Sequence, residues 1–244
     1  MTQLSVNVNK VALLRNARNI GRPSVISAVE TCIRAGAHGI TVHPRPDERH
    51  IKFSDVYELA EILTVEFNIE GNPLHSKFME IVRDVKPTQC TLVPDAPEAF
   101  TSDHGWDLTQ DNKNLVTVIQ ELKELGIRVS LFVDPNPFQI QLAKEIGADR
   151  VEIYTEPYAA AFSVGREDSI FEQYVIAAQK AREVGLGVNA GHDLNLQNLR
   201  KFCSIPEILE VSIGHALIAD ALDLGLFNAV KEYLKVLSQT QSVD

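Results

Sequence analysis

The chain has few cysteines, and none of them form a closely spaced pair. Its three cysteines, Cys32, Cys90 and Cys203, lie far apart in the 244 residues, and no CxxC motif occurs. An odd, scattered set argues against a disulfide framework and against a zinc–thiolate site. This usage is typical of reduced thiols, so we expect a cytoplasmic protein.

Long apolar runs and a basic surface are also missing. No stretch approaches the ~20 consecutive apolar residues of a membrane helix. The start, MTQLSVNVNK, has neither the basic residues nor the apolar segment of a secretory signal. The net charge of −10 disfavours nucleic-acid binding, although a local basic pocket could still hold an anionic substrate. We therefore expect neither a membrane nor a nucleic acid as partner.

Short apolar runs alternate with longer segments along the whole chain. The runs are about five residues long and rich in Val, Ile, Thr or Phe, which is typical of buried strands. Eight such runs occur, at 5–9, 39–43, 66–70, 90–94, 128–133, 150–155, 186–191 and 210–214.

The segments between these runs carry helix signals. Apolar residues recur at threes and fours from 217 to 237, which predicts one long final helix. A further helix is expected over about 167–184. Four segments end in a glycine just before the next run: Gly36, Gly126, Gly147 and Gly185. Polar residues or proline open others, at 23–24, 54–55, 136–137 and 195.

Eight strand–helix units in one linker-free chain favour a single (β/α)8 TIM barrel of the α/β class. A doubly wound open sheet is the alternative. Such sheets usually have fewer strands, and the P-loop and GxGxxG patterns are absent. We predict one domain over residues 1–238 and a loose C-terminal tail over 239–244.

Polar and titratable residues follow the predicted strands, where (β/α)8 enzymes place their active sites. Four of the seven histidines, His43, His50, His192 and His215, fall at these positions together with Glu70. One histidine alone is usually structural, but this convergence indicates acid–base catalysis. The other residues of interest at strand ends are Asn7, Asn9, Lys10, Arg45, Asp95, Asp134, Thr155, Glu156, Asn189 and Gly214, and the long loop after the fourth run adds Thr101, Ser102 and His104.

Two glycine-containing motifs, NAGHD and IGHALI, follow the last two strands. Backbone N–H groups at such helix starts favour a phosphate, and Arg45 and Arg18 could clamp a second one. A metal site is the less favoured alternative, because neither an HxH motif nor a carboxylate-rich set dominates. The loop 95–111 with Trp106 is either a lid or a surface loop. His38 lies at the wrong end of the barrel for catalysis, and His75 is expected at the surface.

Longer motifs extend over nearly the whole chain. They are VNVNKVALLRNAR at 6–18, GITVHPRPDERHI at 39–51, FNIEG at 67–71, TLVP at 91–94, VSLFVD at 129–134, VNAGHDL at 188–194 and IGHALI at 213–218. In combination they resemble the pyridoxine 5′-phosphate synthase family. The resemblance implies a (β/α)8 barrel with extra helical elements that assembles into a homo-octamer.

The resemblance also implies a reaction and a set of roles. The family condenses 3-amino-2-oxopropyl phosphate with 1-deoxy-D-xylulose 5-phosphate, giving pyridoxine 5′-phosphate, phosphate and water without a metal or organic cofactor. His43 and Glu70 match its general bases, and His192 matches its general acid. The positions that match or adjoin its substrate-binding residues are Asn7, Asn9, Lys10, Arg18, Arg45, His50, Thr101, Asp193, Gly214 and His215.

Two departures from the family pattern concern substrate binding. Asn9 and Lys10 stand where the common motif has Asp-His, and Asp193 replaces a glycine. Asn9 cannot act as a base, and Lys10 keeps a cation on a longer stem. The three catalytic positions are unchanged, so we expect an active enzyme.

Two other functions compete with this one. A Schiff-base aldolase needs a lysine in the active site, and Lys10 is the one candidate at a strand end. A catalytically dead barrel that binds a phosphorylated ligand is the second rival, supported only by the departures at positions 9, 10 and 193.

Overall fold

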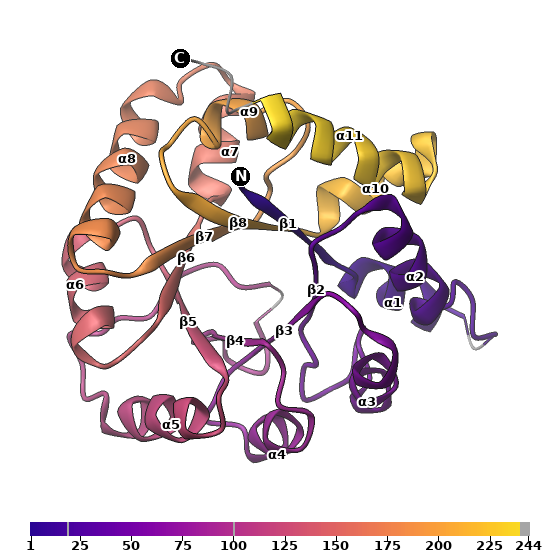
Figure 1. The fold of residues 1–244 in the computed structure, drawn as a ribbon, viewed down its shortest axis with the longest axis horizontal. Helices are drawn as coiled ribbons and strands as arrows, with labels where there is room; N and C mark the ends of the chain where they lie inside the picture. Colours follow the sequence, from indigo (N-terminus) through magenta and orange to yellow (C-terminus); the bar gives the residue numbers. More distant parts are fainter. Residues whose placement is uncertain (19, 100, 240–244) are drawn as a thin grey trace.

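The computed structural model describes residues 1–18, 20–99 and 101–239. Eight parallel strands close into a barrel in sequence order, which confirms the predicted (β/α)8 fold (Figure 1). The strands are β1 (Gln3–Asn7), β2 (Gly39–Val42), β3 (Glu66–Gly71), β4 (Gln89–Leu92), β5 (Arg128–Val133), β6 (Arg150–Tyr154), β7 (Gly187–Gly191) and β8 (Ile208–Ile213).

Helices surround this barrel, and three of the connections after strands carry two helices each. The pairs follow β1, β6 and β8, and α11 packs on α2 beside the barrel (Figure 1). The helices are α1 (Asn9–Asn16), α2 (Val25–Ala35), α3 (Phe53–Ile62), α4 (Ser76–Val85), α5 (Lys113–Glu124), α6 (Pro137–Glu145), α7 (Glu156–Ser163), α8 (Asp168–Glu183), α9 (Leu199–Phe202), α10 (His215–Leu224) and α11 (Leu226–Gln239). In the part of the chain that the structure describes, no helix could span a bilayer.

Most of the predicted helix-start and helix-end residues lie where the sequence analysis placed them. The glycines at 36, 126, 147 and 185 all have positive φ, which is the left-handed conformation expected just past a helix. Ser24 caps α2 by accepting a hydrogen bond from the Ser27 N–H, and Asn136 caps α6 in the same way. Asn195 accepts from two backbone N–H groups of a turn, whereas α9 begins only at Leu199.

The prediction of one long final helix is wrong. Two helices, α10 and α11, occupy this segment, and Gly225 separates them with φ +76°. Apolar spacing continues through the break because both helices use the same period, so the pattern alone does not reveal the turn. Phe227 is 42% exposed, although it falls on the predicted buried face. Gln239, placed in the tail, is the last residue of α11, and 240–244 lie outside the described residues.

The inside of the barrel is polar, unlike the bulky branched filling that is usual for this fold. Ser5 Oγ lies 2.7 Å from Thr41 Oγ1 on the neighbouring strand. Asn189 Nδ2 donates to Gln89 Oε1 at 3.3 Å, and this bond crosses the interior because β7 and β4 are not neighbours. The buried polar residues of the strands are Ser5, Thr41, Asn68, Glu70, Gln89, Thr91, Ser130, Glu152, Asn189, Glu210 and Ser212.

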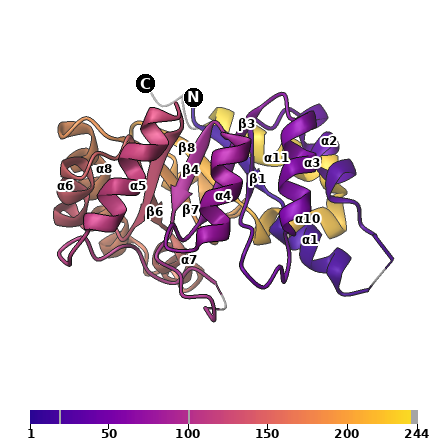
Figure 2. The same ribbon diagram turned by 90° about the horizontal axis from the view of Figure 1, so that it is seen from below.

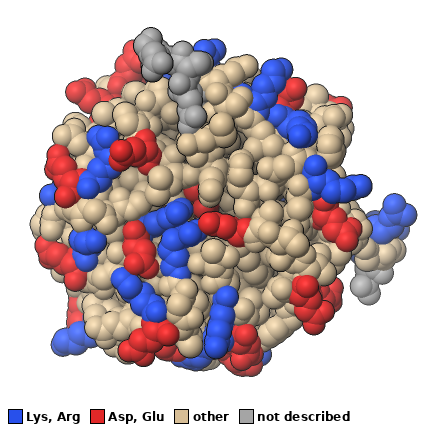
Figure 3. Space-filling model, in the orientation of Figure 1, with Lys and Arg blue, Asp and Glu red and all other residues tan. Residues whose placement is uncertain are grey.

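Paired charges lie where the strands begin. Arg128, the first residue of β5, donates to Glu66, the first residue of β3. Arg150 Nη1 lies 3.6 Å from Glu210 Oε2 on β8. Basic and acidic side chains also meet near the centre of the face that Figure 3 shows. The N-terminus and the loop between β4 and α5 lie on opposite sides of the molecule (Figure 2), so the paired charges are far from the loops that follow the strands.

Candidate active site

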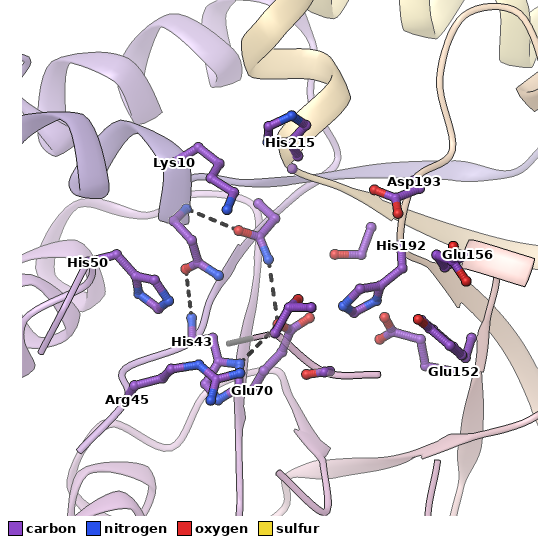
Figure 4. Close-up of a pocket in the computed structure, with 17 residues that line it drawn as sticks. Lys10, His43, Arg45, His50, Glu70, Glu152, Glu156, His192, Asp193 and His215 are labelled. Atoms are coloured by element: carbon purple, nitrogen blue, oxygen red, sulfur yellow. Dashed lines mark hydrogen bonds and ion pairs between the residues drawn. The ribbon is translucent and has the colours of Figure 1, made fainter. Parts of the chain in front are cut away.

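A cavity of about 370 Å³ lies at the carboxyl ends of the strands. All the predicted site residues except Arg18 line it, so residues from six different strand ends and their loops meet at one place (Figure 4). The lining residues are Asn7, Asn9, Lys10, His43, Arg45, His50, Glu70, Thr101, Ser102, Glu152, Tyr154, Glu156, His192, Asp193, Ser212, Gly214 and His215. Among the described residues, no group of three or more His, Cys, Asp or Glu side chains is arranged to hold a metal.

Arg18 does not line this cavity. It is exposed on the turn after α1, so its role in substrate binding stays a prediction. The preceding residues of the same motif, Arg15 and Asn16, instead contact the loop after β2.

His43 and Glu70 form a buried pair in the cavity wall. His43 Nδ1 lies 3.9 Å from Glu70 Oε2, which is close but beyond hydrogen-bonding distance. Burial, assisted by the positive charge of Arg45, lowers the pKa of His43 well below its usual value. Burial, with the negative charges of Glu152 and Asp95, raises the pKa of Glu70 well above its usual value. The imidazole of His43 is therefore uncharged at neutral pH, and the carboxyl group of Glu70 holds its proton more strongly than it would in water.

Asn9 positions this pair through backbone contacts. Its Oδ1 accepts a hydrogen bond from the His43 N–H at 2.9 Å, and its own N–H donates to Asn7 Oδ1 at 3.0 Å. Asn7 Nδ2 in turn donates to Glu70 Oε2 at 3.4 Å. Because an amide oxygen accepts this bond as a carboxylate would, asparagine at position 9 preserves the support of His43.

Arg45 is held by protein groups in the cavity wall. Its Nη2 lies 2.5 Å from Asp95 Oδ2, and both side chains are almost fully buried. Ser102 Oγ donates to the same carboxylate oxygen, and Arg45 Nη1 donates to the Ala99 carbonyl. The charge of Arg45 is thus largely balanced. Lys10 also lines the cavity, and no ion pair joins it to another of the described residues.

His50 is an uncharged donor at the edge of the site. Its Nδ1 accepts a hydrogen bond from the Ile51 N–H at 2.9 Å, which leaves the proton of the neutral ring on Nε2. Burial, together with the positive charges of Arg45 and Lys10, lowers the pKa of His50 to about 4. The ring centroid of His50 lies 6.3 Å from that of His43.

His192 is presented by a strained turn after β7. His192 has φ +85° and Asp193 has φ +60°, and residues other than glycine rarely adopt such positive values. Its ring packs on Phe132 and Tyr154, with centroids 5.1 and 5.4 Å away. Burial lowers the pKa of His192, against the opposing effect of the Asp193 charge. The imidazole is therefore uncharged at neutral pH until a further anion lies beside it.

Sequence reasoning missed Glu152, Tyr154 and Ser212. Each points into the cavity from a strand whose alternate residues are apolar and face the helices. A charged residue between Val151 and Ile153 was the available signal, because a strand buried on both faces rarely contains an unpaired glutamate. Lys10 and His50 lie on one side of the cavity, whereas Glu152, Glu156 and Asp193 lie on the other (Figure 4).

Glu152 should make stability fall with rising pH. Burial and the negative charge of Glu210 raise its pKa from 4.5 to about 8. Because the folded-state pKa exceeds the unfolded one, its stabilising contribution is complete below about pH 4.5 and is lost as the pH rises to about 8.

Glu152→Gln, which stays neutral, should therefore gain about 1.4 kcal/mol relative to the parent for each pH unit in this window. Urea unfolding at several pH values measures the difference. A gap that stays constant with pH would contradict the raised pKa. Gly191→Ala tests whether the effect depends on the position of this carboxyl group. A Cβ at 191 would lie 2.2 Å from Glu152 Oε1 and displace it.

The loop between β4 and α5 is anchored near its middle. The indole Nε1 of Trp106 donates to the Leu92 carbonyl at 2.9 Å, and the backbone N–H of Trp106 donates to the Phe132 carbonyl. Gly105 permits this contact, because a Cβ there would lie 2.4 Å from the Val133 Cα. Thr101 lines the cavity, whereas His104 is exposed. The loop's action as a lid stays a prediction.

The two remaining histidines lie outside the cavity. His38 Nδ1 accepts a hydrogen bond from the Leu4 N–H at 3.1 Å, at the amino end of the barrel. His75 precedes α4 and is only partly exposed; its Nε2 is buried without a partner among the described residues.

Solved structures of similar shape share the fold with little sequence identity. N-(5′-phosphoribosyl)anthranilate isomerase from Pyrococcus furiosus matches with a TM-score of 0.63 and 14% identity, over 98% of this chain and 100% of its own. Such a likeness supports the (β/α)8 barrel alone.

Sequence relatives are much more similar. The pyridoxine 5′-phosphate synthase of Cytophaga hutchinsonii is 52% identical over 240 residues, which cover 98% of this chain and 100% of the relative. The enzyme of that name from Porphyromonas gingivalis is 52% identical over 234 residues, covering 96% and 98%. The family described as pyridoxal phosphate biosynthesis protein PdxJ matches residues 4–239. This chain, with its polar cavity at the carboxyl ends of eight strands, is a member of the PdxJ family.

Proposed function

We propose that this chain is a pyridoxine 5′-phosphate synthase. It condenses 3-amino-2-oxopropyl phosphate with 1-deoxy-D-xylulose 5-phosphate, and it releases pyridoxine 5′-phosphate, inorganic phosphate and water. The observation that carries the proposal is the full-length identity of about half to relatives of that name. The buried His43–Glu70 pair in a polar cavity agrees with it.

The reaction needs groups that change between acid and base roles. The substrate amine attacks a ketone, phosphate and water leave, and a carbon–carbon bond closes the ring, so most steps move a proton. His43 is uncharged at neutral pH and is therefore ready to accept a proton. Burial and nearby carboxylates raise the pKa of Glu70, so this group gives up its proton less readily than an exposed glutamate and accepts one more readily.

His192 becomes the general acid when substrate binds. Its imidazole is uncharged in the free protein because burial lowers its pKa. A phosphate dianion beside the ring raises that pKa, since a nearby negative charge favours the charged imidazolium. Binding of the phosphorylated substrate thus loads His192 with the proton that a leaving group requires.

The cationic side of the cavity binds phosphate. Lys10 lines the cavity and supplies a positive charge, and His50 supplies an N–H donor. The start of α10 at Gly214–His215 adds backbone N–H groups, which favour anions at a helix N-terminus. A Cβ at 214 would lie 3.2 Å from Asn7 Cβ, so glycine also fits the close approach of β1.

A Schiff-base aldolase is the second candidate, because Lys10 lines the cavity. Borohydride reduction in the presence of a ketose phosphate tests it directly. A covalent adduct on Lys10 would favour the aldolase, and its absence removes that reading. Turnover of the two proposed substrates would exclude a catalytically inactive binding protein.

The experiment combines purified, metal-stripped protein with 1-deoxy-D-xylulose 5-phosphate and freshly prepared 3-amino-2-oxopropyl phosphate. We expect pyridoxine 5′-phosphate by fluorescence and inorganic phosphate in parallel, in equal amounts. Phosphate release without the fluorescent product would indicate a different reaction. Binding of both substrates without turnover would make Asn9 and Lys10 the first positions to revert to Asp and His.

We also propose that the protein acts in the cytoplasm as a homo-octamer, as the family resemblance implies. Apolar side chains of α1 and of the α10–α11 region are exposed, among them Leu14 at 55% and Leu222 at 79%. A second copy of the chain would cover them. Sedimentation of the purified protein measures the assembly, and a monomer at micromolar concentration would contradict it.

A further inference from the structure

The last residue of α1, Asn16, contacts the loop after β2 through its side-chain amide. Asn16 Nδ2 lies 3.2 Å from the Glu48 carbonyl, 3.2 Å from that of Arg49 and 2.8 Å from that of His50. Three successive carbonyls therefore point at one amide group. We infer that Asn16, assisted by Arg15, is a positioning residue that holds His50 in place for phosphate binding; this rests on the proposed function.

Convergence of three carbonyl groups is unfavourable without a donor between them. Their oxygen atoms carry like partial charges, and each backbone carbonyl needs a hydrogen-bond partner when it is removed from water. The amide of Asn16 supplies two N–H groups at this point. Glu48 adopts φ +51°, so the backbone is also strained where the carbonyls turn inward.

Arg15 holds the same segment by a second route. Its Nη2 donates to the His50 carbonyl at 3.1 Å and to Asp55 Oδ2 at 2.9 Å. Asp55 Oδ2 also accepts from the Lys52 N–H at 2.7 Å, which fixes the start of α3. Arg15 Nε donates to Asn16 Oδ1 at 3.0 Å, so the two side chains support each other.

Both routes end at His50. Its backbone carbonyl is fixed by Arg15 and Asn16, and its ring Nδ1 accepts from the next residue's N–H. This leaves the Nε2–H donor on a ring that lines the catalytic cavity. If the carbonyls separate, the Ile51 N–H moves with the chain, and the ring loses the bond that selects its tautomer. Arg15 and Asn16 of the LRNAR motif (residues 14–18) thus have a positioning role that does not depend on Arg18.

The test uses Asn16→Ala and Arg15→Lys in the full-length protein. Asn228→Ala is the matched control, because Asn228 Nδ2 donates to a single exposed carbonyl, that of Leu224, outside the cavity lining. Imidazole ¹⁵N resonances of the free protein, assigned with His50→Gln, report the His50 tautomer. Steady-state kinetics with the two substrates report KM and kcat separately.

We expect His50 of the parent and of Asn228→Ala to show a single Nε2–H tautomer. Asn16→Ala should show a mixture of tautomers and about a tenfold higher KM for a phosphorylated substrate, with kcat much less affected. Arg15→Lys, which keeps the charge beside Asp55, should show a smaller change in the same direction. It serves as the deciding variant if Asn16→Ala does not fold.

An unchanged His50 tautomer in the folded variants would overturn the inference, whatever the kinetics. The same holds for a loss of kcat at constant KM. The resonances are measured without substrate, so they test the positioning role of Asn16 independently of the proposed synthase activity. A changed tautomer in a protein that makes no product would support the positioning role and count against the synthase activity alone.

Discussion

Glu70→Gln should lower kcat by about 10²-fold or more, with little change in the binding of either phosphorylated substrate. The amide occupies the same space and can still accept the hydrogen bond that Asn7 Nδ2 gives to Glu70. It cannot exchange a proton with the substrate or with His43, 3.9 Å away. Single-turnover measurements with both substrates would locate the lost step.

His43→Ala should lower kcat by a similar factor, and the double variant by much less than the product of the two. Residues that act as one unit give such non-additive effects. Glu80→Gln, on the exposed surface of α4, is the matched control and should leave turnover unchanged. Full activity of Glu70→Gln would remove Glu70 from the catalytic set, and additive losses would show that the two residues act in separate steps.

Arg45→Met should destabilise the fold by about 3–5 kcal/mol. Arg45 and Asp95 are each 3% exposed, and Asp95 Oδ1 has no partner among the described residues. Removing the guanidinium leaves a buried carboxylate for which Ser102 is the only side-chain donor among the described residues. Urea unfolding measures the loss in the free energy of unfolding.

Two further variants test this explanation. Arg45→Met combined with Asp95→Asn should recover much of the stability, because the uncompensated charge is gone. Arg83→Met breaks an ion pair with Glu121 at the surface and should cost only about 0–1 kcal/mol. Equal losses for the two arginine variants would show that burial does not determine the strength of the Arg45–Asp95 interaction.

The departures at positions 9 and 10 have different consequences in the structure. Asn9 keeps the hydrogen bond that holds the His43 backbone, which a carboxylate could also make. Lys10 places a free ammonium group in the cavity where Arg45 is already balanced by Asp95. Phosphate binding should therefore depend more on Lys10 than on Arg45, whose charge Asp95 already balances.

Much of this protein could be read from its sequence, because local signals act over a few residues. Glycines past helix ends, capping residues such as Ser24 and Asn136, and short apolar runs each depend on neighbours in the chain. Once the strands are known to be parallel, their carboxyl ends must meet on one face. This places His43, Glu70 and His192 in one cavity before any coordinates are known.

Other features were decided only by the tertiary structure. The inward direction of Glu152, the break between α10 and α11, and the placement of Arg15 rather than Arg18 against the site depend on packing between distant segments. The raised pKa of Glu70 and the Arg45–Asp95 pair need burial and charges that lie close in space but far apart in sequence. Residue identity determines which groups can titrate, and the surrounding fold determines at what pH they do, because desolvation and charge act through space.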